Sequence, residues 1–254
     1  MLNHVRLLAI LVLLPLVAFD ARAAMPQNLP QLDARVGLNA YAALVEQEFE
    51  STQTGLRALA ETENVLSGDW ERIAGPLGEF AKGVPTAAAV WFARPDGSYF
   101  TTAAGLTDQN LRSRDYFAGL MAGKEVIGDL VISKSTGKRS AIIAVPVRQG
   151  DRVIGALGVS MAMEKIAALV DDKIHFPKEV MFYALDRQGQ IALHRQSTLL
   201  FEFAAQLGSE SLTAAVGDML AKPEGTVRYE FQGAQREAIF IRTQATGWVY
   251  ALRW

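Results

Sequence analysis

The chain has 254 residues, of which 50% are hydrophobic and 20% charged, and its formal net charge is −2. This is the composition of an ordinary globular protein, which excludes collagen-like and largely disordered chains. The absence of cysteine excludes disulfides, cysteine-based metal sites and a thiol nucleophile, and no basic stripe indicates nucleic-acid binding.

The first predicted element is a secretory leader. Residues 7–19 form an uncharged apolar run that follows Arg6, and the small-residue motif A-R-A ends at Ala23. Such a sequence is typical of a signal peptide. We expect cleavage to remove residues 1–23 and to give a periplasmic or secreted chain without a membrane span. The alternative is an uncleaved N-terminal membrane anchor, although the run is shorter than the about 20 residues that span a bilayer.

A long amphipathic helix is predicted after Pro30, from Leu32 to Leu66. Apolar residues recur there at spacings of three and four with polar residues between them, which is the helical period. A second, shorter helix is predicted at Glu71–Phe80 and ends before the turn at residues 83–85. Residues 24–84 are therefore assigned to a long helix and linker.

The composition then changes to segments rich in β-branched and aromatic residues that are separated by turn residues, a pattern typical of antiparallel strands. In the first module, residues 85–172, the predicted strands are Ala88–Ala93, Ser98–Thr102, Val126–Ser133, Arg139–Val147 and Val153–Met163, with helices at Leu111–Ala122 and Met163–Asp172. In the second, smaller module, residues 173–254, they are Val180–Leu185, Gln190–His194, Thr226–Gln232, Glu237–Thr243 and Trp248–Arg253, with a helix at Glu210–Leu220.

A weak internal repeat supports two modules of one kind. Trp91 and Tyr183 lie 92 residues apart, each in the middle of the same proline–aromatic–glycine spacing. The Gln-Gly pairs that end at Gly150 and Gly233 match at a smaller offset of 83 residues. The predicted fold class is α+β, with a long N-terminal helix followed by two tandem modules that carry antiparallel sheets.

An ordered set of motifs occupies residues 112–161. They are R-D-Y-F at 114–117, G-x-x-x-I at 123–127, T-G at 136–137, P-V at 146–147 and G-x-L-G-V at 155–159. With the tandem layout, they resemble the double Cache domain, the PAS-like extracellular sensor module of bacterial chemoreceptors and sensor kinases. The resemblance implies that the first, membrane-distal type of module holds the ligand, between its sheet and the loops that carry Arg114.

The ligand site predicted from this resemblance consists of Arg114, Tyr116, Phe117, Ser160, Trp91 and Ser133. The planar fork of Arg114 suits a carboxylate, and Tyr116 and Phe117 suit the apolar walls of a pocket. Each residue also has a structural interpretation. Arg114 could pair with Asp108 or Asp115 on the surface, and Trp91 and one of the two adjacent aromatic residues could belong to the core.

Ser160 departs from the family pattern. Amino-acid-binding members of the family carry an Asp at this place in the G-x-L-G-V strand, where it holds the ligand ammonium group. A neutral serine cannot offset that charge, so the resemblance implies a small carboxylate or neutral polar ligand. Ser160 could equally be a small filler in a crowded strand.

No catalytic residue, metal site or cofactor is predicted. His175 and His194 are the histidines beyond the leader, and they are too scattered for a metalloprotease motif. The G-V-S-M-A segment at 158–162 lacks the last glycine of a nucleophile elbow, and the segment at 133–138 fails the phosphate-loop pattern at both ends. We expect His194 and Arg195 to be the solvated end of a strand.

The predicted function is that of an exported small-molecule-binding sensor, not an enzyme. Its expected partners are a small organic ligand and a membrane receptor or sensor kinase, with no nucleic acid. The alternative is a non-catalytic adaptor or structural protein whose modules have lost the pocket, which a packed first module with Phe117 inside would favour. A hydrolase is the third possibility. The sequence leaves open the ligand, the oligomeric state and whether the second module binds anything.

Overall fold

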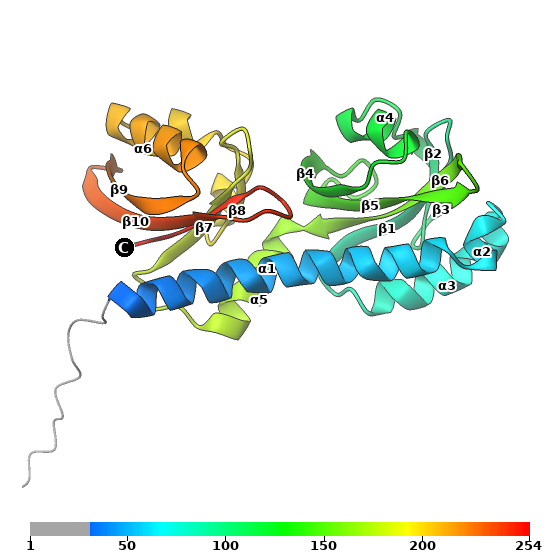
Figure 1. Cartoon of the computed structure of the whole chain (residues 1–254), viewed down its shortest axis with the longest axis horizontal. Coiled ribbons are helices and arrows are strands. Elements are labelled where there is room, and N and C mark those ends of the chain that lie inside the picture. The colour runs from blue at the N-terminus through cyan, green and yellow to red at the C-terminus, as the bar shows by residue number, and fades with distance from the viewer. Residues whose placement is uncertain (1–30) are drawn as a thin grey trace, which may run out of the picture.

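The structure, a computed structural model, describes residues 31–254, so the predicted leader lies outside the described part of the chain. Helix α1 (Gln31–Ala60) runs beneath two modules that lie side by side along it (Figure 1). The predicted helix to Leu66 was too long. The chain leaves the helix at Glu61, Thr62 takes an extended backbone, and the short helix α2 (Glu63–Leu66) follows. Helix α3 (Trp70–Lys82) then leads into the first module.

The first module is built on a six-stranded antiparallel sheet with the strand order β3-β2-β1-β6-β5-β4. Helix α4 (Asp115–Met121) packs on one face of this sheet, and α1 and α3 cover the other. Strand β3 was missed from the sequence because its residues are polar and mostly exposed. The strands are β1 (Ala87–Ala93), β2 (Ser98–Thr101), β3 (Gly105–Asn110), β4 (Val126–Ile132), β5 (Arg139–Gln149) and β6 (Arg152–Ala162).

The second module has a five-stranded antiparallel sheet with the order β8-β7-β11-β10-β9. Helix α5 (Met163–Ile174) links the two sheets, and the boundary predicted between residues 172 and 173 falls inside it. Helix α6 (Glu210–Ala221) and the short helices η1 (Ser197–Leu199) and η2 (Ala204–Gln206) cover the face away from α1. The strands are β7 (Met181–Leu185), β8 (Ile191–His194), β9 (Glu224–Phe231), β10 (Ala234–Arg242) and β11 (Val249–Arg253).

The two sheets have matching topologies, with β7 in the place of β1 and β11 in the place of β6. Trp91 on β1 faces Gly158 on β6 in the register, and Tyr183 on β7 faces Ala251 on β11 in the same way. The predicted equivalence of Trp91 and Tyr183 is therefore confirmed, because they occupy the same position in two matching sheets. The predicted match of the Gln-Gly pairs is wrong, because Gly150 joins β5 to β6, whereas Gly233 joins β9 to β10, the counterparts of β4 and β5.

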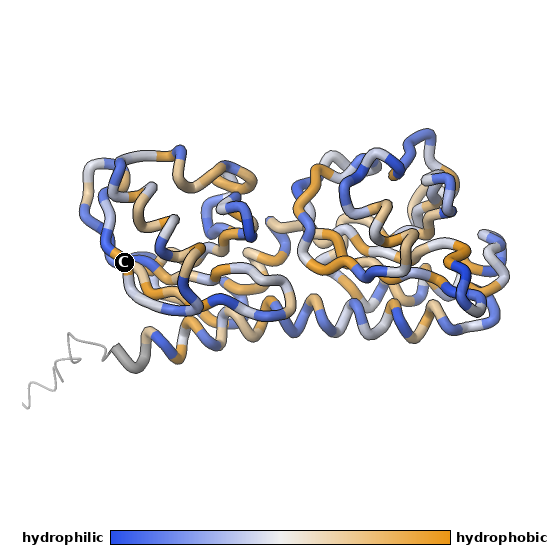
Figure 2. Tube along the Cα trace, turned by 45° about the horizontal axis from the view of Figure 1, so that its top comes forward, coloured by the Kyte–Doolittle hydropathy of each residue, from blue (hydrophilic) through white to orange (hydrophobic). Residues whose placement is uncertain are grey.

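A continuous core joins α1 to both sheets. Leu38, Tyr41, Val45, Phe49 and Leu56 are fully or almost fully buried along the sheet-facing side of α1. They meet inward-facing residues of both modules in a single cluster, together with residues of α5. Figure 2 shows the hydrophobic residues concentrated in the strands, while the outer loops are hydrophilic. One face of each sheet thus packs against α1 in a core that both modules share. The other face is covered by α4 in the first module and by α6 in the second.

Two carboxylates of α1, the buried Glu46 and the half-buried Glu48, anchor the helix to the two modules. Glu46 accepts hydrogen bonds from the hydroxyls of Thr246 at 2.7 Å and Tyr250 at 2.6 Å, both in the second module. Two residues further, Glu48 accepts one from the Thr86 hydroxyl at 2.6 Å, next to β1. None of the described helices is both long and apolar enough to cross a membrane.

Candidate ligand-binding site

The face of the first sheet beneath α4, here called the α4 face, is filled by side chains. Trp91 is 2% exposed and Phe117 3% exposed, and both belong to a buried cluster with Tyr116. Gly158 lies directly against the indole, since a Cβ atom added there would approach the Trp91 ring to 2.1 Å. The structure therefore brings three of the predicted site residues together as tightly packed core.

The other predicted site residues lie around this core. Ser160 is buried on the same side of β6 as Gly158, because alternate strand residues share a face. Ser133 is buried in the turn after β4, with its Oγ atom 3.4 Å from that of Ser135. A ligand-binding role for these serines stays a prediction.

Arg114 lies at the edge of the aromatic cluster, next to Tyr116. Its guanidinium donates a hydrogen bond to the carbonyl oxygen of Ile132, and it forms no salt bridge within residues 34–254. It lines an open cleft of about 550 Å³ between the modules, together with Tyr116, Asp129 and Arg187. Arg114 thus faces the boundary between the modules, and its role in ligand binding also stays a prediction.

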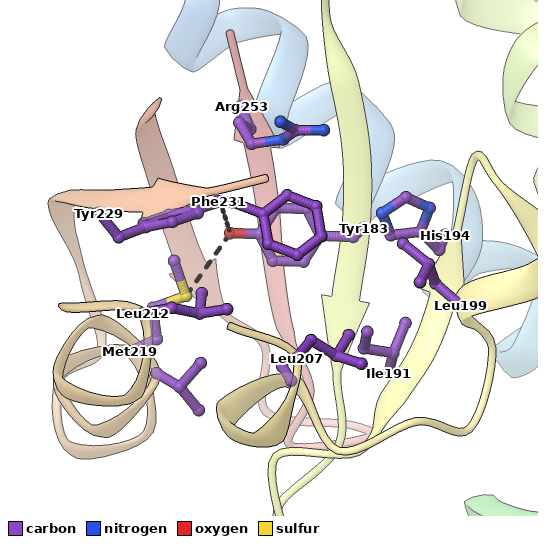
Figure 3. Close-up of a pocket in the computed structure, with 12 residues that line it drawn as sticks. Tyr183, Ile191, His194, Leu199, Leu207, Leu212, Met219, Tyr229, Phe231 and Arg253 are labelled. Atoms are coloured by element: carbon purple, nitrogen blue, oxygen red, sulfur yellow. Dashed lines mark hydrogen bonds between the residues drawn. The ribbon is translucent and has the colours of Figure 1, made fainter. Parts of the chain in front are cut away.

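The corresponding face of the second sheet, the α6 face, holds a pocket that is partly open to solvent (Figure 3). The pocket offers about 40 Å³ to the centres of water-sized groups. Tyr183, His194, Tyr229 and Arg253 supply its polar atoms, and they come from four different strands. Figure 3 shows Arg253, Tyr183 and His194 toward one end, with apolar side chains from α6 and the loops at the other. The apolar lining is Ile191, Leu199, Ala204, Leu207, Leu212, Val216, Met219 and Phe231.

His194 is held in a defined tautomer. Its Nδ1 atom accepts a hydrogen bond of 2.8 Å from the backbone N–H of Gln196, so the neutral ring carries its hydrogen on Nε2. Burial, followed by the nearby Arg253 guanidinium, lowers the pKa of His194 to about 4. The ring is 5% exposed, so the predicted solvated strand end is wrong for His194. Its neighbour Arg195 turns away and pairs with Asp171 at 2.9 Å.

Two tyrosine hydroxyls meet inside the pocket. The Tyr183 and Tyr229 oxygens are 3.2 Å apart, and the Tyr183 hydroxyl also donates to Met219 Sδ at 3.8 Å. Burial raises the pKa of both phenols, so both remain protonated at neutral pH. The hydroxyls therefore offer polar contacts without adding negative charge.

Arg253 brings a cation without a counter-ion to the pocket. Its guanidinium lies 5.6 Å from the Phe231 ring centroid, and it forms no salt bridge or side-chain hydrogen bond within residues 34–254. Burial lowers the pKa of Arg253, and the nearby Arg236 lowers it further. Sequence reasoning missed this site. The signal that indicates it is the alternation of Val249, Ala251 and Arg253, which puts a charge at an inward position of a buried strand.

Two tandem modules with antiparallel sheets on one long helix are the architecture of PAS-like sensor domains. The chain belongs to the Cache domain family, whose profile matches residues 27–253. Cache domains are ligand-binding sensors of receptors and kinases, act outside the cytoplasm and are generally not enzymes. In the described part of the chain, no three His, Asp or Glu side chains gather as they would around a metal ion.

Solved structures with the same fold are distant in sequence. The ligand-binding domain of the Pseudomonas aeruginosa PAO1 amino acid chemoreceptor PctB, in complex with L-Arg, is 16% identical, with a TM-score of 0.71 over 87% of this chain and 93% of that chain. The sensor domain of the V. cholerae histidine kinase DctB is 15% identical, with a TM-score of 0.64 over 87% and 95%.

A longer receptor also shares the fold. An extracellular ligand binding receptor from Desulfohalobium retbaense is 15% identical, with a TM-score of 0.70, and the match covers 89% of this chain but 41% of that chain. No curated protein sequence matches the chain significantly. The comparisons therefore establish the family and the fold.

Proposed function

We propose that this protein is a small-ligand sensor whose ligand occupies the pocket on the α6 face of the second module. The observation that carries the proposal is the contrast between the two covered faces. The α4 face is closed by Trp91 and Phe117, whereas the α6 face holds a partly open, mostly apolar pocket with a few convergent polar groups. Pockets of that composition are the usual small-molecule sites of proteins. The ligand is an organic molecule, either a carboxylate or neutral and polar.

The proposal places the protein outside the cytoplasm, after cleavage of the predicted leader. There it reports ligand binding to a membrane receptor or a sensor kinase by direct contact, without catalysing a reaction. Its membership of the Cache family supports this role, as does its fold, which PctB and DctB share.

A thermal-shift screen of small organic acids, amides, alcohols and polyols tests the proposal. A true ligand at 100-fold over its Kd should add about 2.7 kcal/mol to the free energy of unfolding. In Leu212→Phe, the larger ring should occupy the pocket and abolish the response, because Leu212 lines it. Ala214→Phe, on the exposed side of α6, is the matched control and should respond normally. A screen without any response, or an unchanged response in Leu212→Phe, would refute the site.

A second candidate function is a non-catalytic adaptor, which the buried positions of Trp91 and Phe117 favour for the first module. An adaptor should bind its receptor with an affinity that no small molecule changes. Measuring receptor binding in the presence of each screened compound separates the two functions. Turnover of an ester and amide panel by the purified protein would instead support the hydrolase alternative.

A further inference from the structure

The matching topology of the sheets identifies which residues are equivalent on the α4 and α6 faces. Trp91 and Tyr183 are equivalent, and two residues before each of them the register pairs Ala89 with Ser160 and Met181 with Arg253. Arg253 therefore occupies the place of Ser160. A small neutral side chain on the first sheet is replaced on the second by a guanidinium.

A second substitution of the same kind lies beside the first. Ser160 is paired across the sheet with Ile142, and Arg253 with Ala238. The residues two positions earlier are Ser140 on β5 and Arg236 on β10, so these are also equivalent. The Nε atom of Arg236 is buried and has no hydrogen-bond partner within the described residues. The α6 face thus carries two arginines where the α4 face carries two serines.

Within the described residues, nothing on the α6 face neutralises these charges. The side chains that α6 directs toward the sheet are apolar: Leu212, Ala215, Val216 and Met219. The inward residues of the strands are also uncharged, apart from the two arginines: Tyr183, Leu185, Ile191, Val227, Tyr229, Phe231, Ala238, Phe240, Val249 and Ala251, with His194 neutral near pH 7. A partly buried cation without a counter-ion is unfavourable, and an anionic ligand would relieve this.

The donors are arranged for a carboxylate. A guanidinium presents two parallel N–H groups that match the two oxygens of a carboxylate. The fixed tautomer of His194 leaves its Nε2–H as a further donor, because Nδ1 is occupied by the Gln196 N–H. The opposite end of the pocket offers aliphatic surface from residues such as Leu207 and Leu212, which suits a short alkyl group.

The size of the cavity limits the ligand. A water molecule needs about 10–15 Å³ of such volume, so about 40 Å³ holds roughly three water-sized groups. That accommodates a carboxylate with a carbon or two.

We propose that the α6-face pocket binds a short monocarboxylate of the size of acetate or propionate, with its carboxylate on Arg253 and His194 and its alkyl group toward α6. This inference rests on the proposed function and specifies the ligand class of the same pocket. Arg253 is then the residue that selects acids over neutral molecules of equal shape.

Isothermal titration of the purified protein with acetate, propionate, acetamide and propionamide tests the inference, with ionic strength held constant by sodium chloride. We expect each acid to bind at least about tenfold more tightly than its amide, since a charge-assisted pair is stronger than a neutral hydrogen bond. Arg253→Gln should remove that preference, and Arg253→Lys should restore part of it. Arg228→Gln is the matched control, because Arg228 lies on the same sheet but pairs with Glu237 at the surface.

The possible outcomes distinguish a wrong ligand class from a wrong ligand site. Equal binding of acids and amides, or an unchanged acid preference in Arg253→Gln, would overturn the monocarboxylate as the ligand class. The proposal that the pocket binds a small ligand would be unaffected. The same holds if only other, neutral compounds of the wider screen bind and are blocked by Leu212→Phe. No binding by any compound in either experiment would overturn both. Circular dichroism of each variant confirms that the fold is retained.

Discussion

Equivalent faces of the two sheets are filled in different ways. In the first module, Trp91 lies flat against Gly158 and closes the space beneath α4. In the second, the equivalent Tyr183 faces Ala251, and its hydroxyl meets Tyr229 in a lined cavity beneath α6. Topology alone therefore does not decide whether such a face is filled with side chains or holds a pocket. A few side chains at equivalent positions decide which it becomes.

The largest expected effect comes from removing the residue that closes the α4 face. Trp91→Ala should lower the free energy of unfolding by about 3–5 kcal/mol, because it deletes a buried aromatic side chain and leaves a cavity above Gly158. Urea unfolding followed by circular dichroism measures the loss. Ligand binding in the second module should persist in the folded variant. A loss of less than about 1 kcal/mol in the free energy of unfolding would mean that the Trp91 indole is not part of a packed core.

A smaller, pH-dependent effect should come from the α6 face. Since burial favours the neutral ring of His194, the unfolded chain takes up a proton near its ordinary pKa of about 6.5, before the folded protein does at about 4. The free energy of unfolding should therefore fall as the pH drops through this window, by about 2 kcal/mol at pH 5 from this group.

Comparing urea unfolding at pH 7.5 and pH 5 in the wild type and in His194→Gln isolates this contribution. The variant should lose less stability on acidification than the wild type. His175→Asn is the control, because His175 ends α5 in a left-handed conformation that Asn also tolerates. An equal loss in His194→Gln and the wild type would show that the ring titrates normally.

The smallest effect on stability should come from Arg114→Ala. Arg114 lies at the open cleft between the modules and forms no described salt bridge, so its removal should cost less than about 1 kcal/mol. The informative measurement for Arg114→Ala is its thermal-shift response to the ligand. An unchanged response agrees with the α6-face pocket, whereas a lost response in a folded variant would return the ligand site to the first module.

The fold could be predicted largely because its signals are local. Alternating strands, the long amphipathic helix and the motif set at residues 112–161 gave the Cache family and the α+β architecture, which the structure and the family match confirm. The strand β3 escaped because polar edge residues carry little alternation. The Gln-Gly match failed because similar turns recur at hairpins that are not equivalent.

The α6-face pocket could not be predicted, because its polar residues are gathered from four strands by tertiary pairing. Tyr183 was noticed only for its place in the repeat, and the bulge between β7 and β8 that turns His194 inward leaves no mark in the sequence. Arg253 carried a signal in its alternation with Ala251. To recognise that Arg253 takes the place of Ser160, the two modules must be aligned correctly. The incorrect match of the Gln-Gly turns prevented that alignment.

Strand β11 has a further consequence for how the domain could report an occupant. Arg253 points into the pocket, while Tyr250, on the opposite side of the same strand, donates its hydroxyl to Glu46 in the middle of α1. One strand therefore separates the pocket from the anchor of the long helix. A displacement of β11 would act on both contacts at once, and only the thickness of one β-strand lies between them.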